Sequence, residues 1–240
     1  MNSEFHAVDS PVASIPVETA AEGHGSATAR RSFLRRTGGF LGAAAAGAAA
    51  MVITSDKASA GYLGSRPELM RQLRLVQRHE NSHVTFLVNA LGGLARPKPT
   101  FQNLLQPTLS RFLNVSRALE NTGVGAYLGA APVIFNSGFL AAAGSIALVE
   151  ARHAGYFNSL DSRPMTENLF GQELDFERAF TVAEVVAAAG PFVADLNGGP
   201  PLTFSDTPSA ANDIAILNFA LALEHLEAEF YNLNIARHGR

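Results

Sequence analysis

Two short motifs in this sequence combine a carboxylate with an imidazole three residues later. Glu80 precedes His83, and Glu150 precedes His153. Residues three apart lie on the same face of a helix, so each pair can reach one ion together. A carboxylate and an imidazole, supplied twice, are what a dinuclear iron or manganese site in a helix bundle requires.

Each pair also has a simpler interpretation. Glu80 and His83 would form a solvated pair at a helix edge, and Glu150 and His153 would be satisfied by Arg152 or by the backbone. Both pairs, however, lie within or beside apolar stretches of sequence. Ionisable groups in such places are costly unless they are paired or bound to metal. We therefore favour the metal interpretation for both.

Apolar residues recur at helical spacing in four long stretches, at about residues 66–91, 108–131, 137–160 and 211–237. Asn212 or Asp213 is positioned to cap the last of them. A shorter helix is expected at Thr181–Ala189, because Glu184 stands three residues after Thr181 as in a capping box. Prolines interrupt residues 94–107 and 161–208, which are expected to be loops. With no convincing strand, the chain is predicted to be an all-α bundle.

The other two long helices each offer a carboxylate within an apolar pattern. Glu120 directly follows Leu119, although Arg117 three residues earlier allows Glu120 to face solvent instead. The last helix offers three acids, Glu224, Glu227 and Glu229, and Glu224 is the one that falls between apolar residues. Its spacing to Tyr231 and the family resemblance described below select Glu224 as the expected ligand and leave the other two as bystanders.

Three further side chains neighbour the predicted ligands. Tyr231 follows Glu224 by seven positions and so lies about two turns away on the same face. It is the candidate catalytic residue, although a core tyrosine is the simpler interpretation. His79 and His225 are adjacent to ligands but point about 100° away on an ideal helix. They are expected on the surface or just outside the ligand sphere.

Composition narrows the class of protein. The 240 residues are 47% hydrophobic, carry a formal net charge of −3 and include no cysteine. Such a weak charge excludes nucleic acid as an expected partner. Without cysteine there is no disulfide and no thiolate ligand, so a metal must be bound by His, Asp, Glu or Tyr.

The first 60 residues are predicted to be a leader followed by the domain at residues 61–240. Paired arginines at Arg30-Arg31 precede Phe33-Leu34, a small apolar run from Phe40 to Ile53, and an Ala-x-Ala site at residues 58–60. This resembles a twin-arginine signal. The alternative is a membrane anchor, but a run of about 14 residues is shorter than the roughly 20 that span a bilayer. We therefore expect cleavage, no stable membrane span, and a periplasmic or extracellular location.

Four runs carry a resemblance to a known family: HENSHVTFLVNALGG, LENTGVGAYLGAAP, IALVEARHAGY and ILNFALALEHLEAEFY. They are similar to a bacterial, exported ferritin-like family that is related to plant desiccation-associated proteins. The similarity extends over nearly all of residues 66–237. It implies a ferritin-like four-helix bundle in which Glu120 and Glu224 are the carboxylates of the single-Glu helices. The two Glu-x-x-His pairs would then supply the bridging and terminal ligands.

The order of the helices departs from that family. The helix containing Glu224 comes first in the family but last here, so the sequence resembles a circular permutation. The segment 161–210 is long enough to connect opposite ends of a bundle. We therefore expect the last helix to complete the site of its own chain. Two alternatives are swapping of this helix into a neighbouring chain, giving a homo-oligomer, and a truncated double-domain protein.

Two functions fit these features. In the first, two iron ions, or manganese, react with oxygen or peroxide in an oxidase, ferroxidase or peroxide-consuming protein. In the second, the protein is a non-enzymatic, desiccation-related stress protein whose metal site is vestigial or unused. An intact ligand set favours the first function, and the resemblance to desiccation-related proteins favours the second.

Overall fold

Four long helices form the bundle in the computed structural model, which describes residues 65–239. They are α2 (Arg66–Leu91), α3 (Leu109–Ala130), α4 (Ser137–Leu160) and α6 (Ala210–His238). These bounds lie within one residue of the predicted ranges, and the predicted all-α four-helix bundle is confirmed. The predicted leader at residues 1–60 lies outside the described residues. Among the residues described, no helix has both the length and the apolar character needed to cross a membrane.

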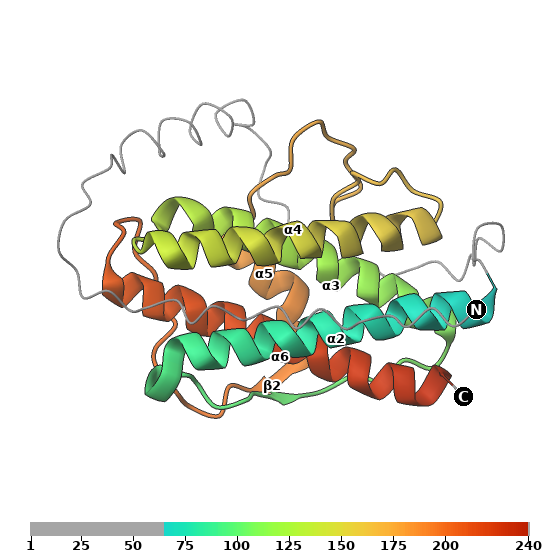
Figure 1. Cartoon of the computed structure of the whole chain (residues 1–240), viewed down its shortest axis with the longest axis horizontal. Coiled ribbons are helices and arrows are strands. Elements are labelled where there is room, and N and C mark those ends of the chain that lie inside the picture. The colour runs from blue at the N-terminus through green and yellow to red at the C-terminus, as the bar shows by residue number, and fades with distance from the viewer. Residues whose placement is uncertain (1–64, 240) are drawn as a thin grey trace, which may run out of the picture.

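The helices pack as two antiparallel pairs, α2 with α6 and α3 with α4 (Figure 1). The start of α2 meets the end of α6, where Arg66 donates a hydrogen bond to the carbonyl oxygen of His238. Two apolar clusters lie along the bundle axis, one around Leu73 and Phe230 and the other around Leu87 and Leu221. On α2 these clusters leave between them the turn that carries Glu80 and His83, so apolar packing closes the site from both ends.

The cap of α6 differs from the prediction. Ser209, rather than Asn212 or Asp213, accepts a hydrogen bond from the backbone N–H of Asn212 and caps the helix. The Asp213 carboxylate instead accepts the backbone N–H groups of Phe135 and Asn136, at 2.7 and 2.8 Å. Asp213 is in the first turn of α6 but holds the segment that enters α4. The sequence alone did not show which backbone this side chain would reach.

Two asparagines of α6 hold the segment that links α2 to α3. The Asn218 side chain accepts the backbone N–H of Arg96 at 2.7 Å, and Asn234 accepts that of Gln106 at 2.8 Å. Between these points β1 (Thr100–Phe101) pairs antiparallel with β2 (Val193–Asp195). This short sheet was not predicted. Its backbone hydrogen bonds connect the loop at residues 94–107 to the Pro-rich segment at residues 161–208.

The predicted short helix is present as α5 (Val182–Ala189). The Thr181 hydroxyl accepts the Glu184 backbone N–H, and the Glu184 carboxylate accepts the Thr181 backbone N–H, which confirms the capping box. Just before this helix, Phe180 packs on α3 at Gly125 and Gly129. A Cβ at Gly125 would lie 2.3 Å from the Phe180 ring, and one at Gly129 would lie 2.3 Å from the Phe180 carbonyl oxygen.

Replacing Gly129 with alanine is therefore expected to destabilise the fold. The added methyl group meets backbone, which cannot turn aside as a side chain can, and overpacking of this kind costs about 1–3 kcal/mol. Gly144→Ala on α4 is the matched control, because nothing lies within 4 Å of its added Cβ and alanine favours helix by about 1 kcal/mol. Urea unfolding of both variants tests the expectation, and equal midpoints would contradict it.

Candidate metal centre

All six predicted ligands meet in the middle of the bundle. α2 supplies Glu80 and His83, α4 supplies Glu150 and His153, and the other two helices supply one carboxylate each: Glu120 from α3 and Glu224 from α6. The four carboxylates are at most 1% exposed and the two histidines at most 9%. The described chain therefore brings both Glu-x-x-His motifs and both single carboxylates to one buried place, with α6 of the same chain completing it.

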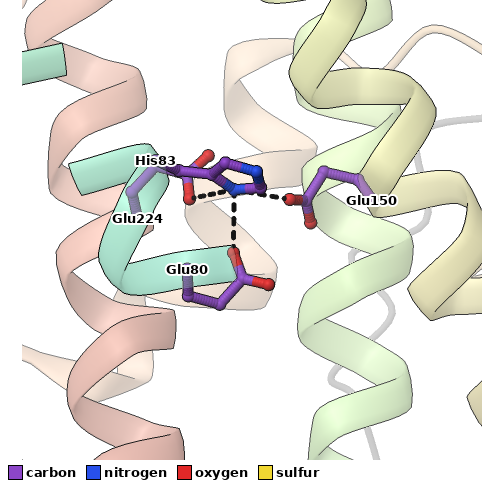
Figure 2. Close-up of side chains that lie close together, drawn as sticks. All are labelled: Glu80, His83, Glu150 and Glu224. Carbon is purple, nitrogen blue, oxygen red and sulfur yellow. Dashed lines mark hydrogen bonds and ion pairs between the residues drawn. The ribbon is translucent and has the colours of Figure 1, made fainter. Parts of the chain in front are cut away.

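One half of the cluster surrounds His83 (Figure 2). The Nδ1 atom of His83 lies 3.1 Å from Glu80, 3.2 Å from Glu150 and 3.2 Å from Glu224. These carboxylates come from three different helices and converge on a single nitrogen. One imidazole and three carboxylates thus form a first group with ligand atoms all within 4.8 Å of one another.

The second half surrounds His153. Its Nδ1 atom lies 3.0 Å from Glu80 and 3.0 Å from Glu120. With Glu150 these residues form a second group, whose ligand atoms also lie within 4.8 Å of one another. Glu80 and Glu150 belong to both groups. The arrangement therefore has two adjacent positions, each with one imidazole and one carboxylate of its own, and two carboxylates that both positions share.

The shared carboxylates are under-satisfied by hydrogen bonds. Both oxygens of Glu150 and Oε1 of Glu80 are buried and have no hydrogen-bond partner. An imidazole Nδ1 can donate one hydrogen bond, so it cannot satisfy every oxygen that surrounds it. Buried anionic oxygens normally have partners, and a cation is one of the few that fits here. Two divalent cations would balance the four carboxylates, so the residues fit a dinuclear centre.

The electrostatics of the protein without metal reflect the same crowding. Burial alone would lower the pKa of His83, but the close carboxylates of Glu150, Glu224 and Glu80 raise it to about 12. His153 behaves alike: burial opposes protonation, yet Glu120 and Glu80 raise its pKa to about 11. Burial, followed by repulsion from Glu80 and other nearby carboxylates, holds the pKa of Glu150 well above its ordinary value. Protons occupy this cluster where cations would bind.

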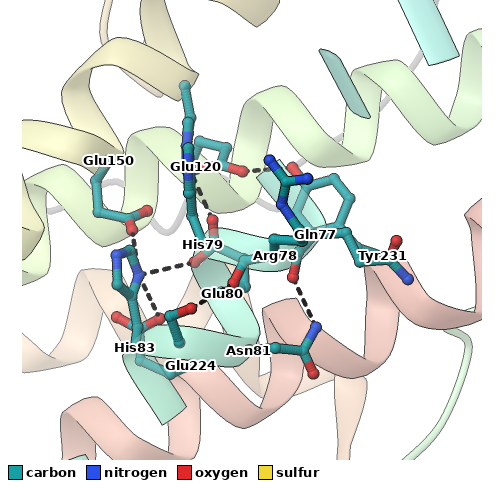
Figure 3. Close-up of polar contacts among 12 residues, drawn as sticks. Gln77, Arg78, His79, Glu80, Asn81, His83, Glu120, Glu150, Glu224 and Tyr231 are labelled. Carbon is teal, nitrogen blue, oxygen red and sulfur yellow. Dashed lines mark hydrogen bonds and ion pairs between the residues drawn. The ribbon is translucent and has the colours of Figure 1, made fainter. Parts of the chain in front are cut away.

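Two tyrosines hold the two carboxylates that are not shared. Tyr127 of α3 donates a hydrogen bond of 2.5 Å to Oε1 of Glu224 on α6. In the opposite direction, Tyr231 of α6 donates a short hydrogen bond to Oε1 of Glu120 on α3 (Figure 3). In both carboxylates the other oxygen, Oε2, faces a histidine Nδ1. Each tyrosine therefore turns one carboxylate so that a single oxygen points into the centre.

Tyr127 was missed in the sequence, although its signal is present there. It follows Glu120 by seven residues, the same spacing that identified Tyr231 after Glu224. Glu227 was also underestimated. It was expected to be a bystander, yet it is only 4% exposed, and burial with repulsion from Glu120, Glu80 and Glu224 raises its pKa well above the ordinary value. Glu229, by contrast, pairs with Lys98 at 2.6 Å on the outside of the bundle.

Removing either tyrosine hydroxyl is expected to weaken metal binding. Tyr231→Phe leaves Oε1 of Glu120 without its donor, and Tyr127→Phe does the same to Glu224. Partners outside the ligand sphere typically contribute about 10- to 100-fold in metal affinity. Titration with Mn²⁺ measures the loss, and Tyr156→Phe on α4, a half-buried tyrosine outside the cluster, is the control. Unchanged affinity in both cluster variants would contradict this role for the hydroxyls.

Comparison with known proteins agrees with this geometry. A family model described as a ferritin-like domain matches residues 28–162 and 212–240, which include every residue of the cluster. No curated protein and no solved structure matches the chain. The predicted permutation of helix order, the export and the relation to desiccation proteins stay predictions. By the family match, the buried Glu and His cluster and the helix bundle, the chain belongs to the ferritin-like domain family.

Proposed function

We propose that this protein binds a dinuclear centre of iron, or of manganese, and uses it in redox chemistry with oxygen or peroxide. The observation that carries the proposal is the pair of four-residue groups that share Glu80 and Glu150. Oxygen and nitrogen ligands of this kind suit Fe(II) and Mn(II). Two such ions, when bound, would supply the electrons that reduce oxygen or peroxide.

The chain's own residues prepare the site in three ways. Glu80 and Glu150 lie where a carboxylate can contact both ions. His83 and His153 point Nδ1 inward and so fix the two positions along the bundle. The tyrosines orient the remaining carboxylates, and the apolar clusters on either side keep bulk water away, which strengthens every electrostatic contact inside.

Metal analysis of the purified protein tests the proposal. We expect two ions per chain after anaerobic loading with Fe(II), and consumption of oxygen or peroxide by the loaded protein. Mass measurement in the same run shows whether one chain or a swapped oligomer holds the ions. A protein that binds fewer than one ion per chain under saturating Fe(II) or Mn(II) would end the proposal.

A second candidate is a non-enzymatic stress protein. The observation that favours it is the ion pairing in the cluster itself, where each protonated histidine is surrounded by carboxylates. Such pairing stabilises the bundle without any metal. Iron-loaded protein that consumes neither oxygen nor peroxide would support this candidate over the redox function.

Export is the other part of the proposal. It is supported by the sequence Arg30-Arg31-Ser32-Phe33-Leu34 ahead of a small apolar run. Cell fractionation, with Arg30 and Arg31 both changed to lysine as the comparison, tests it. Equal export of both forms would exclude the twin-arginine route.

A further inference from the structure

His79 lies next to the ligand Glu80 in sequence but outside the ligand cluster. Its Nδ1 atom is 2.9 Å from Nε2 of His153, the ring nitrogen that points away from the centre. The two ring planes differ by 5° and their centroids are 5.2 Å apart. The centroid separation equals the 2.9 Å distance between the two nitrogens plus the distance from centroid to nitrogen in each ring. The sum is this large only when both centroids and both nitrogens lie on one line, so the rings lie in one plane. The contact is thus an in-plane hydrogen bond, edge to edge.

This bond fixes the protonation of His153 when its Nδ1 binds a cation. A cation on Nδ1 leaves the ring proton on Nε2. The lone pair of His79 Nδ1 then accepts that N–H group. The bond holds the His153 ring in the orientation that directs Nδ1 at Glu80 and Glu120. It also makes the coordinating nitrogen a stronger donor to metal.

The other half of the centre has no equivalent. Exchanging α2 with α4, and α3 with α6, maps each position of the centre onto the other. Each position has one imidazole and three carboxylates, and one of the three carboxylates accepts a hydrogen bond from a tyrosine. The residue before Glu80 is His79, but the residue before Glu150 is Val149. No residue of the described chain forms a hydrogen bond with Nε2 of His83. The two positions therefore match in their ligands and differ in this outer partner.

We propose that His79 is a positioning residue that makes the two metal positions unequal, so that the position of His153 and Glu120 binds a divalent cation more tightly and fills first. This inference rests on the proposed function, because it requires two ions. It adds an order of filling that the ligand residues alone do not give.

Titration with Mn²⁺, followed by the electron paramagnetic resonance signal of the free ion, tests the order. The unmodified protein is expected to bind two ions with unequal affinities. His79→Leu should weaken the tighter step by about 10- to 100-fold and leave the weaker step unchanged. His79→Asn should restore most of the loss, because an asparagine Oδ1 lies where the imidazole Nδ1 does. His225→Leu, a histidine next to Glu224 in sequence, is the matched control.

Two double variants identify the position. In a Glu224→Gln background the His153 position is intact, so His79→Leu should still weaken binding. In a Glu120→Gln background that position is already impaired, and His79→Leu should add nothing. An equal effect in both backgrounds, or no effect of His79→Leu on the unmodified chain, overturns the inference alone. A chain that binds no Mn²⁺ or Fe(II) at all overturns the proposed function and this inference with it.

Discussion

Glu150→Gln is expected to abolish the two-ion state while leaving the bundle folded. Glu150 is common to both groups of ligands, and both of its oxygens lack hydrogen-bond partners. Loss of one shared carboxylate should lower affinity at both positions by more than about 100-fold, since partners outside the ligand sphere alone contribute about 10- to 100-fold. Metal analysis after loading with Fe(II) measures the change.

The same substitution should not harm the metal-free protein. Burial and repulsion from Glu80 already raise the pKa of Glu150, so a neutral amide of equal size replaces a group that burial disfavours as an anion. We expect an unfolding free energy equal to or above that of the unmodified chain. Glu229→Gln, on the outer face of α6, is the control for metal content. Two ions per chain in Glu150→Gln protein would show that Glu150 is not a shared ligand.

Binding of metal is expected to release protons and to weaken as the pH falls. Burial opposes protonation of the two histidines, but hydrogen bonds to the surrounding carboxylates raise the pKa of His83 to about 12 and that of His153 to about 11. Both Nδ1 atoms therefore carry protons at neutral pH and must lose them before an ion binds. Loading should release at least two protons per pair of ions, one from each histidine, and Glu150, whose pKa is also raised, adds to that number. Calorimetry in buffers of different ionisation enthalpy counts them.

The metal-free protein should show the opposite dependence in its stability. A folded-state pKa above the unfolded value means that the native state binds more protons, so stability falls as the pH rises. For the two histidines the contribution is fully present below pH 6.5 and is lost as the pH rises toward 11 and 12. The metal-free melting temperature should therefore be lower at pH 9 than at pH 6, and saturating metal should reverse the order. A metal-free protein that becomes more stable over that interval would contradict the ion pairing.

Much of the fold could be predicted because its helices carry strong local signals. Apolar residues at helical spacing predicted α2 and α4 at their observed bounds, and the capping box predicted the start of α5. The sheet between β1 and β2 has no such signal. Its strands are two and three residues long, which is too short to show an alternation of apolar and polar residues. Their pairing also joins distant parts of the chain.

The two Glu-x-x-His pairs followed from residue type and spacing, and the choice of Glu120 and Glu224 also used the family resemblance. The surroundings of these side chains could not be predicted in either way. A hydrogen bond such as Tyr127 to Glu224 joins two helices, and its existence depends on how those helices pack. The same holds for His79, whose partner His153 is on another helix. Asp213 was expected to cap its own helix because local geometry permits it. Its carboxylate instead accepts the backbone N–H of Phe135, which lies in the segment between α3 and α4.

The pairing of α2 with α6 has a consequence for when the centre can exist during synthesis. His83 and Glu224 are 141 positions apart in the chain, and contacts between such distant residues form late in folding. The hairpin of α3 and α4 can assemble while the ribosome is still making the rest, whereas α2 must wait for its neighbour to emerge. Cation capture would thus coincide with arrival of the final helix, and a nascent chain halted before α6 should leave Mn²⁺ in solution.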